Sequence, residues 1–235
     1  MSAVKIQANI IVVSASRGIG LELAKQFHAK YPTKGEVVVT MRKPNTNLLP
    51  SEVVVEALDI TSQDSINAFS QKFGSINTLL INAAVRNPDN ILEADSDLLR
   101  WYLESNVMGI HAVVQSLIPA LLAGSSPKRL VYISSTSASM ERQIGAKAGL
   151  QGPYSVSKAA GNMLMIQYYN ALHANTVAVG LIHPGWVATD MRNTAGDGGM
   201  PVEKSVKGII EVVESKLSFE NSPLFVKWEG APLPW

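Results

Sequence analysis

A tyrosine and a lysine stand four residues apart in the stretch Tyr154-Ser-Val-Ser-Lys158. On a helix this spacing puts both side chains on one face, one turn apart. A phenol has an ordinary pKa of about 10, so it is a poor acid or base at pH 7. A neighbouring ammonium favours the phenolate and brings that pKa toward the working range of a general acid. The pair therefore predicts proton transfer, although the same spacing arises often by chance on helix surfaces.

Length and composition limit the class of protein in which this pair can occur. The chain has 235 residues, of which 46% are hydrophobic, and this suits one large α/β domain spanning residues 1–235. A net charge of +1 argues against a dedicated nucleic-acid or membrane surface. The chain contains no cysteine, which excludes disulfides, thiol catalysis and thiolate metal sites and suits a reducing cytosol. The first apolar run, Ile10–Val13, is too short for a signal peptide, and we expect no stretch of membrane-spanning length and a cytoplasmic protein.

Short β-branched runs alternate with longer helical patterns along the chain. The runs are nearly all apolar, as in parallel strands buried on both faces, and the alternation predicts a doubly wound, Rossmann-type α/β sheet of about seven strands with helices on both faces. The predicted strands are Ile10–Val13, Glu36–Thr40, Val53–Leu58, Thr78–Ile81, Leu130–Ile133, Val177–Ile182 and Leu224–Val226. The predicted helices are Ile19–Lys30, Gln63–Phe73, Leu98–Leu122, Tyr154–Ala174 and Val202–Leu217. We expect substrate loops at about 136–153 and 190–203 and see no domain boundary.

The turn after the first strand has the composition of a phosphate-binding turn. It reads Ser14-Ala-Ser-Arg-Gly18-Ile-Gly20 and leads into the first helix. Gly18 allows the backbone to approach a phosphate, Gly20 allows close helix–strand packing, and the helix N-terminus offers unpaired N–H groups to a pyrophosphate. The alternative is a tight turn between strand and helix that binds nothing.

The end of the second strand discriminates between the nicotinamide cofactors. An NAD site places an acid there, whereas this chain reads Thr40-Met-Arg42-Lys43 and carries Arg17 in the glycine turn. Two guanidinium groups can bind a 2′-phosphate with charge-assisted hydrogen bonds, which favours NADP(H) over NAD(H). The alternative is that these are solvated basic residues. Asp59, after the third strand, either accepts from an adenine amino group or caps the next helix, as Thr61 or Ser62 can also do.

Several further segments occur in an order that is typical of one family. They are Asn82-Ala83-Ala84, Asn106-Val-Met-Gly, Ile133-Ser134-Ser135 and Pro184-Gly185-Trp-Val187-Ala-Thr189-Asp190. Together with the glycine turn, Asp59 and the Tyr154–Lys158 pair, they make the chain resemble a short-chain dehydrogenase/reductase of the compact single-domain branch. The segment from His183 to Val187 and the closing Leu-Pro-Trp resemble the C-factor-like or sniffer-like carbonyl reductases in particular.

The resemblance implies a role for each of four residues. Tyr154 gives a proton to a carbonyl oxygen, Lys158 lowers the pKa of Tyr154 and binds the nicotinamide ribose, and Ser135 donates to the carbonyl oxygen. Asn106 holds a water that links Lys158 to solvent. Ser134 is the rival of Ser135, and the family position favours the second serine.

The resemblance also implies a cofactor site. Its expected residues are Ser14, Ser16, Arg17, Gly18, Ile19, Gly20, Arg42, Asp59, Ile60, Asn82, Ala83, Ala84, Tyr154, Lys158, Pro184, Gly185, Val187 and Thr189. The chain departs from the family pattern at Val13, where threonine is usual, and at Ser14 and Ala84, where glycines are usual. A serine at position 14 costs little conformational free energy if its φ is negative and more if its φ is positive.

The function predicted from these residues is an NADP-dependent oxidoreductase acting on a ketone or aldehyde and its alcohol. A second hypothesis is an NADP-binding regulatory or signalling protein with weak catalysis. A third is an epimerase or dehydratase, a class that needs an extra C-terminal substrate domain, which we do not expect in this chain. Neither the four histidines nor the acids are arranged as metal ligands, so we expect no metal. Apolar residues on the helix of Tyr154, with Leu98–Leu122, lead us to expect a homodimer or homotetramer.

Overall fold

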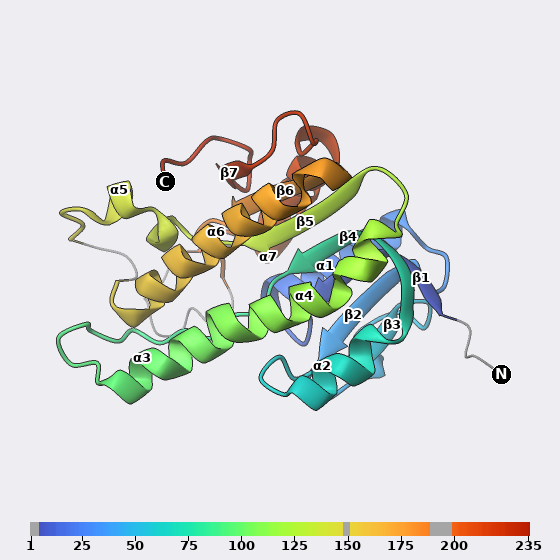
Figure 1. Cartoon of the computed structure of the whole chain (residues 1–235), viewed down its shortest axis with the longest axis horizontal. Coiled ribbons are helices and arrows are strands. Elements are labelled where there is room, and N and C mark those ends of the chain that lie inside the picture. The colour runs from blue at the N-terminus through green and yellow to red at the C-terminus, as the bar shows by residue number, and fades with distance from the viewer. Residues whose placement is uncertain (1–4, 148–150, 189–198) are drawn as a thin grey trace.

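Seven parallel strands form one sheet in the order β3-β2-β1-β4-β5-β6-β7 (Figure 1). The computed structural model describes residues 5–147, 151–188 and 199–235. The strands are β1 (Ile6–Val13), β2 (Val37–Met41), β3 (Val54–Ala57), β4 (Phe73–Ile81), β5 (Lys128–Ile133), β6 (Val177–His183) and β7 (Leu224–Lys227). The predicted doubly wound parallel sheet is therefore confirmed.

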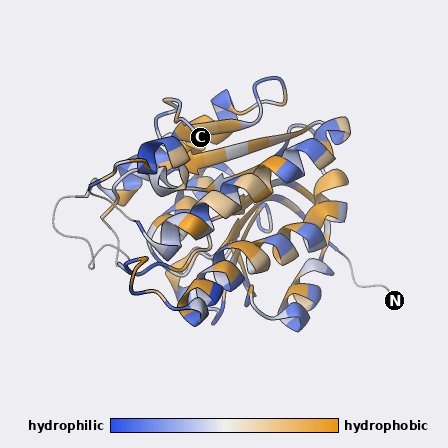
Figure 2. Cartoon of the chain, turned by 60° about the vertical axis from the view of Figure 1, so that its left-hand side comes forward, coloured by the Kyte–Doolittle hydropathy of each residue, from blue (hydrophilic) through white to orange (hydrophobic). Residues whose placement is uncertain are grey.

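Helices cover both faces of the sheet (Figure 1). One face carries α2 (Gln63–Ser70), α4 (Gly109–Leu122) and α6 (Pro153–Leu172), and the other carries α1 (Gly18–Lys30) and α7 (Val202–Glu211). The short helices α3 (Ser96–Leu103) and α5 (Met140–Gln143) lie at the end of the molecule where α6 begins. Figure 2 shows the consequence in hydropathy: the central strands are mostly orange, whereas the helices carry blue on their outer sides.

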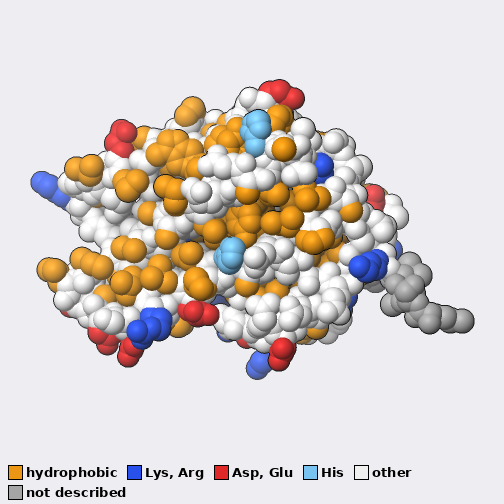
Figure 3. Space-filling view, viewed as in Figure 1, with side chains coloured by type: hydrophobic (Ala, Val, Ile, Leu, Met, Phe, Trp, Pro, Cys, Tyr) orange, Lys and Arg blue, Asp and Glu red, His pale blue; other side chains and the backbone are white. Residues whose placement is uncertain are grey.

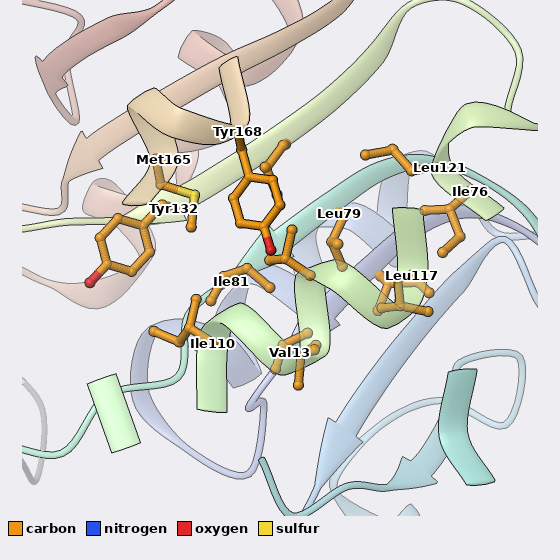
Figure 4. Packing of buried hydrophobic residues seen from close by; sticks show 14 of the residues in the cluster. Val13, Ile76, Leu79, Ile81, Ile110, Leu117, Leu121, Tyr132, Met165 and Tyr168 are labelled. Carbon is orange, nitrogen blue, oxygen red and sulfur yellow. The ribbon is translucent and has the colours of Figure 1, made fainter. Parts of the chain in front are cut away.

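The two cores follow from alternation along each strand. In β1, Ile11 and Val13 pack with α2, α4 and α6, whereas Ile10 and Val12 pack with α1 and α7. Successive strand side chains point to opposite faces, so a strand that is covered on both sides has to be apolar at every position. Figure 4 shows the first of these cores, where strand residues such as Leu79 lie against Ile110 and Leu117 of α4.

The main differences between the predicted helices and the structure are an early helix end, two π-helical turns and one additional short helix. The helix predicted over Gln63–Phe73 ends at Ser70, and Phe73 begins β4, where its ring packs edge-to-face on Phe69 at 4.9 Å. A π-helical turn, Glu104–Met108, interrupts the helix predicted over Leu98–Leu122, and another, Val212–Lys216, follows α7. Helix α5 was not expected, because its four residues are too few to show a helical period.

The continuous helical run Ser96–Leu122, 27 residues long, contains an 18-residue window whose mean hydropathy, 1.4, suits a membrane span. Judged by length and composition alone, this run does reach membrane-spanning length, so the expectation that no stretch does is wrong. Half of the window is buried inside this fold, as in a core helix of a folded domain.

The chain changes direction across the sheet between β1 and β4, which are neighbours in space. From β1 it winds outward through β2 and β3, and then it crosses back to β4 and winds the other way. In open α/β sheets this switch point leaves a crevice at the carboxyl ends of the strands, where ligands bind. The loops after β1, β4 and β5 and the start of α6 meet at this end of the sheet (Figure 1).

Candidate active site

Tyr154 is the second residue of α6 and is buried, with 7% of its surface exposed. The helix begins abruptly because Gly152 has φ 71° and Pro153 occupies the first helical position, where its missing N–H costs nothing. A Cβ on Gly152 would lie 2.3 Å from the Asp89 carbonyl oxygen, so only glycine fits between the helix start and the loop that follows β4. This close approach fixes Tyr154 against that loop.

Ser135 follows β5 and brings its hydroxyl to Tyr154. It caps a short 3₁₀ turn by accepting from the Ser137 N–H at 3.0 Å, and it hydrogen-bonds the Tyr154 side chain. Ser134 points elsewhere, because its hydroxyl donates to Asn162 Oδ1 at 2.5 Å. Of the two serines, Ser135 is the one that the geometry brings to Tyr154.

Lys158 is fully buried one turn along α6. Its Nζ donates to the Ile133 carbonyl oxygen at 2.7 Å and lies 4.0 Å from the centre of the Tyr132 ring. Burial lowers the pKa of Lys158 to about 7, so the amine is only partly protonated at neutral pH. Tyr132 belongs to the buried cluster beneath α6, beside Met165 (Figure 4).

The pKa of Tyr154 does not follow the sequence-based expectation. Burial raises it, while the hydrogen bond from Ser135 and the charge of Arg86 lower it. The expectation that Lys158 brings this pKa down is not met, because the lysine is itself desolvated and directed at Ile133. The tyrosine is therefore a protonated phenol at neutral pH.

Asn106 sits in the π-helical turn between α3 and α4 and is completely buried. Its amide holds the backbone of Val85, accepting from the N–H at 2.7 Å and donating to the carbonyl at 2.9 Å. It also donates to Ser157 Oγ at 2.9 Å, and Ser157 donates to the Tyr154 carbonyl at 2.8 Å. Asn106 thus ties the loop after β4 to the start of α6, and a water relay to Lys158 stays a prediction.

Three residues of this site were missed from the sequence. Ser157 is three residues after Tyr154, and that helical spacing was a usable signal. Tyr132 gave no such signal, because an aromatic residue in a buried strand is usually a core residue. Arg86 gave none either, since an arginine in a loop is usually solvated, yet its Nε and Nη2 are buried here.

The glycine turn has the shape that the sequence predicts, with one strained residue. Gly18 has φ 55°, and a Cβ on Gly20 would lie 2.0 Å from the Ser14 carbonyl oxygen. That oxygen accepts from Asn82 Nδ2 at 2.7 Å, so the end of β4 braces the turn. Ser14 itself has φ 72°, the costly case for a residue with a Cβ. The Ser14 N–H donates to Thr40 Oγ1 at 3.0 Å.

The start of α1 fits a phosphate group. Arg17 precedes the helix with an extended backbone and makes no side-chain cap, and the first turn holds no acid. The first helical N–H groups therefore have no capping side chain, and the helix dipole favours an anion at this end. Arg17, Arg42 and Lys43 are all exposed, and none makes an ion pair within the described part of the chain. These residues fit a dinucleotide that carries an additional phosphate.

Asp59 lies beside Arg42, whose charge contributes to lowering the pKa of the carboxyl. The larger cause is hydrogen bonding, because Oδ1 accepts from the Thr61 hydroxyl at 2.7 Å and from the Thr61 N–H at 2.9 Å. The N-cap of α2 is Ser62, which accepts from the Ser65 N–H at 3.3 Å. An adenine contact of Asp59 stays a prediction.

The remaining expected cofactor residues are divided among the loops at the carboxyl ends of the strands. Gly185 has φ 85°, a conformation that residues with a Cβ rarely adopt, and a Cβ there would lie 2.6 Å from Met200 Cε. Val187 pairs with Met200 as an isolated bridge. The Pro184 carbonyl accepts from Ser205 Oγ at 2.6 Å. Thr189 lies outside the described residues, as do 148–150 and 190–198 of the expected substrate loops. Of the other expected residues, Ile19 lies in the first turn of α1, and Ser16, Ile60, Ala83 and Ala84 lie in the loops after β1, β3 and β4.

His183 is the last residue of β6 and has a structural role. Its Nδ1 accepts from the Thr136 N–H at 3.3 Å, and burial, with the nearby charge of Arg142, lowers its pKa to about 4. It is therefore neutral at pH 7. Within residues 5–147, 151–188 and 199–235, no group of three His, Asp or Glu side chains is arranged to hold a metal ion.

Comparison with known proteins adds four findings. The sequence model of a family described as short chain dehydrogenase matches residues 8–198. A 1-hydroxy-2-glutathionyl-2-methyl-3-butene dehydrogenase of Rhodococcus sp. (strain AD45) is 28% identical over 97% of this chain and 100% of its own. The NADPH-bound carbonyl reductase from chicken fatty liver superposes with a TM-score of 0.86 at 26% identity, covering 99% of this chain and 100% of that one. Carbonyl reductase Sniffer of D. melanogaster, 23% identical over 97% of this chain and 100% of its own, shares the fold with a TM-score of 0.82.

Proposed function

The chain belongs to the short-chain dehydrogenase/reductase family of oxidoreductases, and from that premise we propose that it reduces a ketone or aldehyde with NADPH. The alcohol would be oxidised in the reverse direction. The observation that carries the proposal is the meeting of two hydroxyl donors, Tyr154 and Ser135, beside buried Lys158 at the crevice end of the sheet. The NADPH in the carbonyl reductase from chicken fatty liver supports the cofactor.

The side chains account for the charge that develops during reduction. Bound NADPH supplies the hydride that the carbonyl carbon receives. Ser135 donates a hydrogen bond to the carbonyl oxygen, and Tyr154 transfers its proton there as the negative charge forms. The raised pKa of Tyr154 favours this direction, because a reductase needs the phenol in its protonated form at neutral pH.

Lys158 serves the return of the proton. A phenolate left on Tyr154 would raise the proton affinity of the neighbouring amine, and a pKa of about 7 lets Lys158 exchange protons readily near neutral pH. Asn106 and Ser157 hold the start of α6 in place for this exchange, through the Tyr154 carbonyl.

The cofactor would be held by the residues whose fit is described above. The glycine turn and the start of α1 would receive the pyrophosphate, and Arg17 and Arg42 would receive the 2′-phosphate. Lys158 would contact the ribose, as the resemblance implies, and the turn at Gly185 would lie beside the nicotinamide.

The second candidate, a regulatory or signalling protein that binds NADP without efficient catalysis, gains support from one observation. Ser14 is strained at φ 72° where the family usually has glycine, which can weaken cofactor binding. The reacting side chains are all present, so we place the enzyme first.

The test is consumption of NADPH with a panel of ketones and aldehydes, for the wild type and for Tyr154→Phe. We expect Tyr154→Phe to lower kcat by at least about 100-fold, as for loss of a general acid, with NADPH affinity nearly unchanged. Tyr169→Phe is the matched control, because this tyrosine lies on the same helix and packs on His173 instead. NADPH binding without turnover of any carbonyl would favour the regulatory protein.

Association and location belong to the same proposal. We infer a homodimer or homotetramer formed through α4 and α6, over which hydrophobic side chains gather in Figure 3. Exposed apolar residues there include Met108, the last residue of the π-helical turn before α4, and Met163 on α6, at 57% and 55%. The cytoplasmic location stays a prediction.

A further inference from the structure

Arg86 lies in the loop that follows β4, and two of its buried nitrogens, Nε and Nη2, have no hydrogen-bond partner among the residues that the structure describes. It also makes no ion pair with any carboxylate of the described residues. Buried polar groups are nearly always hydrogen-bonded, and a guanidinium has no acceptor capacity of its own, so each exception needs a reason.

The loop holds Arg86 next to the reacting tyrosine. On one side of Arg86, Val85 is fixed by both backbone hydrogen bonds to Asn106. On the other side, the Asn87 N–H donates to the buried Tyr102 hydroxyl at 2.7 Å. The Tyr102 ring packs edge-to-face on Tyr154 at 6.5 Å, and the charge of Arg86 reaches the Tyr154 hydroxyl. The arginine is therefore positioned by its neighbours rather than by contacts of its own.

The acidic residue nearest to Arg86 in the loop, Asp89, already has a hydrogen-bond partner. Asp89 accepts from the Tyr102 hydroxyl at 2.7 Å and lies outside ion-pair distance of Arg86. The cations suited to a cofactor phosphate, Arg17 and Arg42, lie at the other end of the crevice, beside the glycine turn and Asp59.

We propose that Arg86 binds a carboxylate of the carbonyl substrate, so that the substrate is a keto or aldehyde acid rather than a neutral carbonyl compound. This inference rests on the proposed reductase function and adds the substrate class. A planar guanidinium with two free N–H groups matches a carboxylate, and pairing in a site with little water makes the contact strong. The carboxylate would also complete the hydrogen bonding of the arginine.

The experiment compares each keto acid with its methyl ester. The pairs are benzoylformate and methyl benzoylformate, with the carboxylate beside the carbonyl, and levulinate and methyl levulinate, with it further away. The measured quantity is the ratio of kcat/KM for acid over ester with NADPH, because any effect of Arg86 on Tyr154 itself cancels in this ratio. We expect the wild type to favour an acid, and Arg86→Met to lower the ratio by at least about 30-fold.

Two further variants make the result specific. Arg86→Lys keeps the charge without the planar fork and should retain part of the preference. Arg100→Met is the matched control, since Arg100 is exposed and pairs with Asp97 on the surface of α3, and it should leave the ratio unchanged. Equal use of acid and ester by the wild type, or an unchanged ratio in Arg86→Met, would overturn the inference while the reductase function stands.

Binding provides a readout that does not depend on turnover. Oxamate, an unreactive carboxylate, is titrated calorimetrically into the protein saturated with NADP⁺. We expect heat of binding with the wild type and at least about tenfold weaker binding with Arg86→Met. Absence of oxamate binding in the wild type, in a preparation that reduces neutral ketones, counts against the carboxylate site. If no carbonyl compound is reduced but oxamate still binds through Arg86, the reductase proposal fails and the anion site remains. An equal loss of NADPH affinity in Arg86→Met would instead assign the arginine to a cofactor phosphate.

Discussion

At the scale of single residues, the buried amine of Lys158 links stability to pH. Its pKa is lowered to about 7 in the folded protein from an ordinary 10.5, so the unfolded chain binds this proton more tightly. Folding therefore pays a penalty that is full below pH 7 and is relieved as the pH rises from about 7 to 10.5. The stability of the wild type should rise relative to Lys158→Met by up to about 1.4 kcal/mol per pH unit in that window. Urea unfolding at about pH 6.5 and pH 9 measures the difference.

Lys25→Met serves as the control for this titration. Lys25 is exposed on α1, and the difference in unfolding free energy between Lys25→Met and the wild type should stay constant over this pH window. If Lys158→Met also shows a constant difference over the window, the buried amine does not titrate as the structure indicates.

The proposed reacting groups were easier to locate from the sequence than their electrostatics were to predict. Spacing pointed to Tyr154 and Lys158, the family resemblance pointed to Ser135, and the structure brings all three to one end of the sheet. The direction of the Tyr154 pKa depends on desolvation, which a sequence does not contain. Arg86 was missed for the same reason, because burial distinguishes it from a solvated arginine.

At the scale of elements, Gly20 sets how closely α1 approaches the sheet. A Cβ there would lie 2.0 Å from the Ser14 carbonyl oxygen and 2.6 Å from Asn82 Nδ2. Both atoms belong to one hydrogen bond, so Gly20→Ala has to displace the turn that is expected to receive the pyrophosphate. We expect a loss of about 1–3 kcal/mol in unfolding free energy, as for other overpacked sites, and weaker NADPH binding. Chemical denaturation and cofactor titration measure the two effects.

The control at this scale is Lys25→Ala, an exposed change on the same helix. It should stay within about 0.5 kcal/mol of the wild type and leave NADPH binding unchanged. Wild-type stability and affinity in Gly20→Ala would show that the turn relaxes freely.

Sequence periodicity located these elements but not their irregular parts. All seven strands were predicted because each contains a nearly all-apolar run, and β4 extends back to Phe73 through the less apolar Gly74 and Ser75. The π-helical turn at Glu104–Met108 left no trace in the pattern, because one extra residue in a turn hardly shifts a helical period. The sequence left the sign of φ at Ser14 open, and only the backbone geometry shows that it is positive.

At the scale of the whole molecule, the two halves of the sheet differ in the side chains that they place at the proposed cofactor site. The β1–β3 half carries Arg17, Arg42 and Lys43 at its carboxyl end, whereas Tyr154, Lys158 and Ser135 come from the half that begins at β4. A ligand that bridges both halves should stabilise the fold as a unit, by about 2.7 kcal/mol at a concentration of 100 times its Kd. NADPH should therefore raise the Tm, and NADH at the same concentration should raise it less.

Arg42→Asp tests whether the basic half makes this distinction. The change removes a partner of the 2′-phosphate and adds repulsion, so NADPH affinity should fall about 10- to 100-fold while NADH affinity changes little. The excess Tm shift of NADPH over NADH should then shrink or reverse. Arg100→Asp, an exposed arginine on α3 at a distance from the glycine turn, should keep the wild-type preference. An unchanged preference in Arg42→Asp would mean that the end of β2 does not read the 2′-phosphate, and thermal shifts with both cofactors decide between these outcomes.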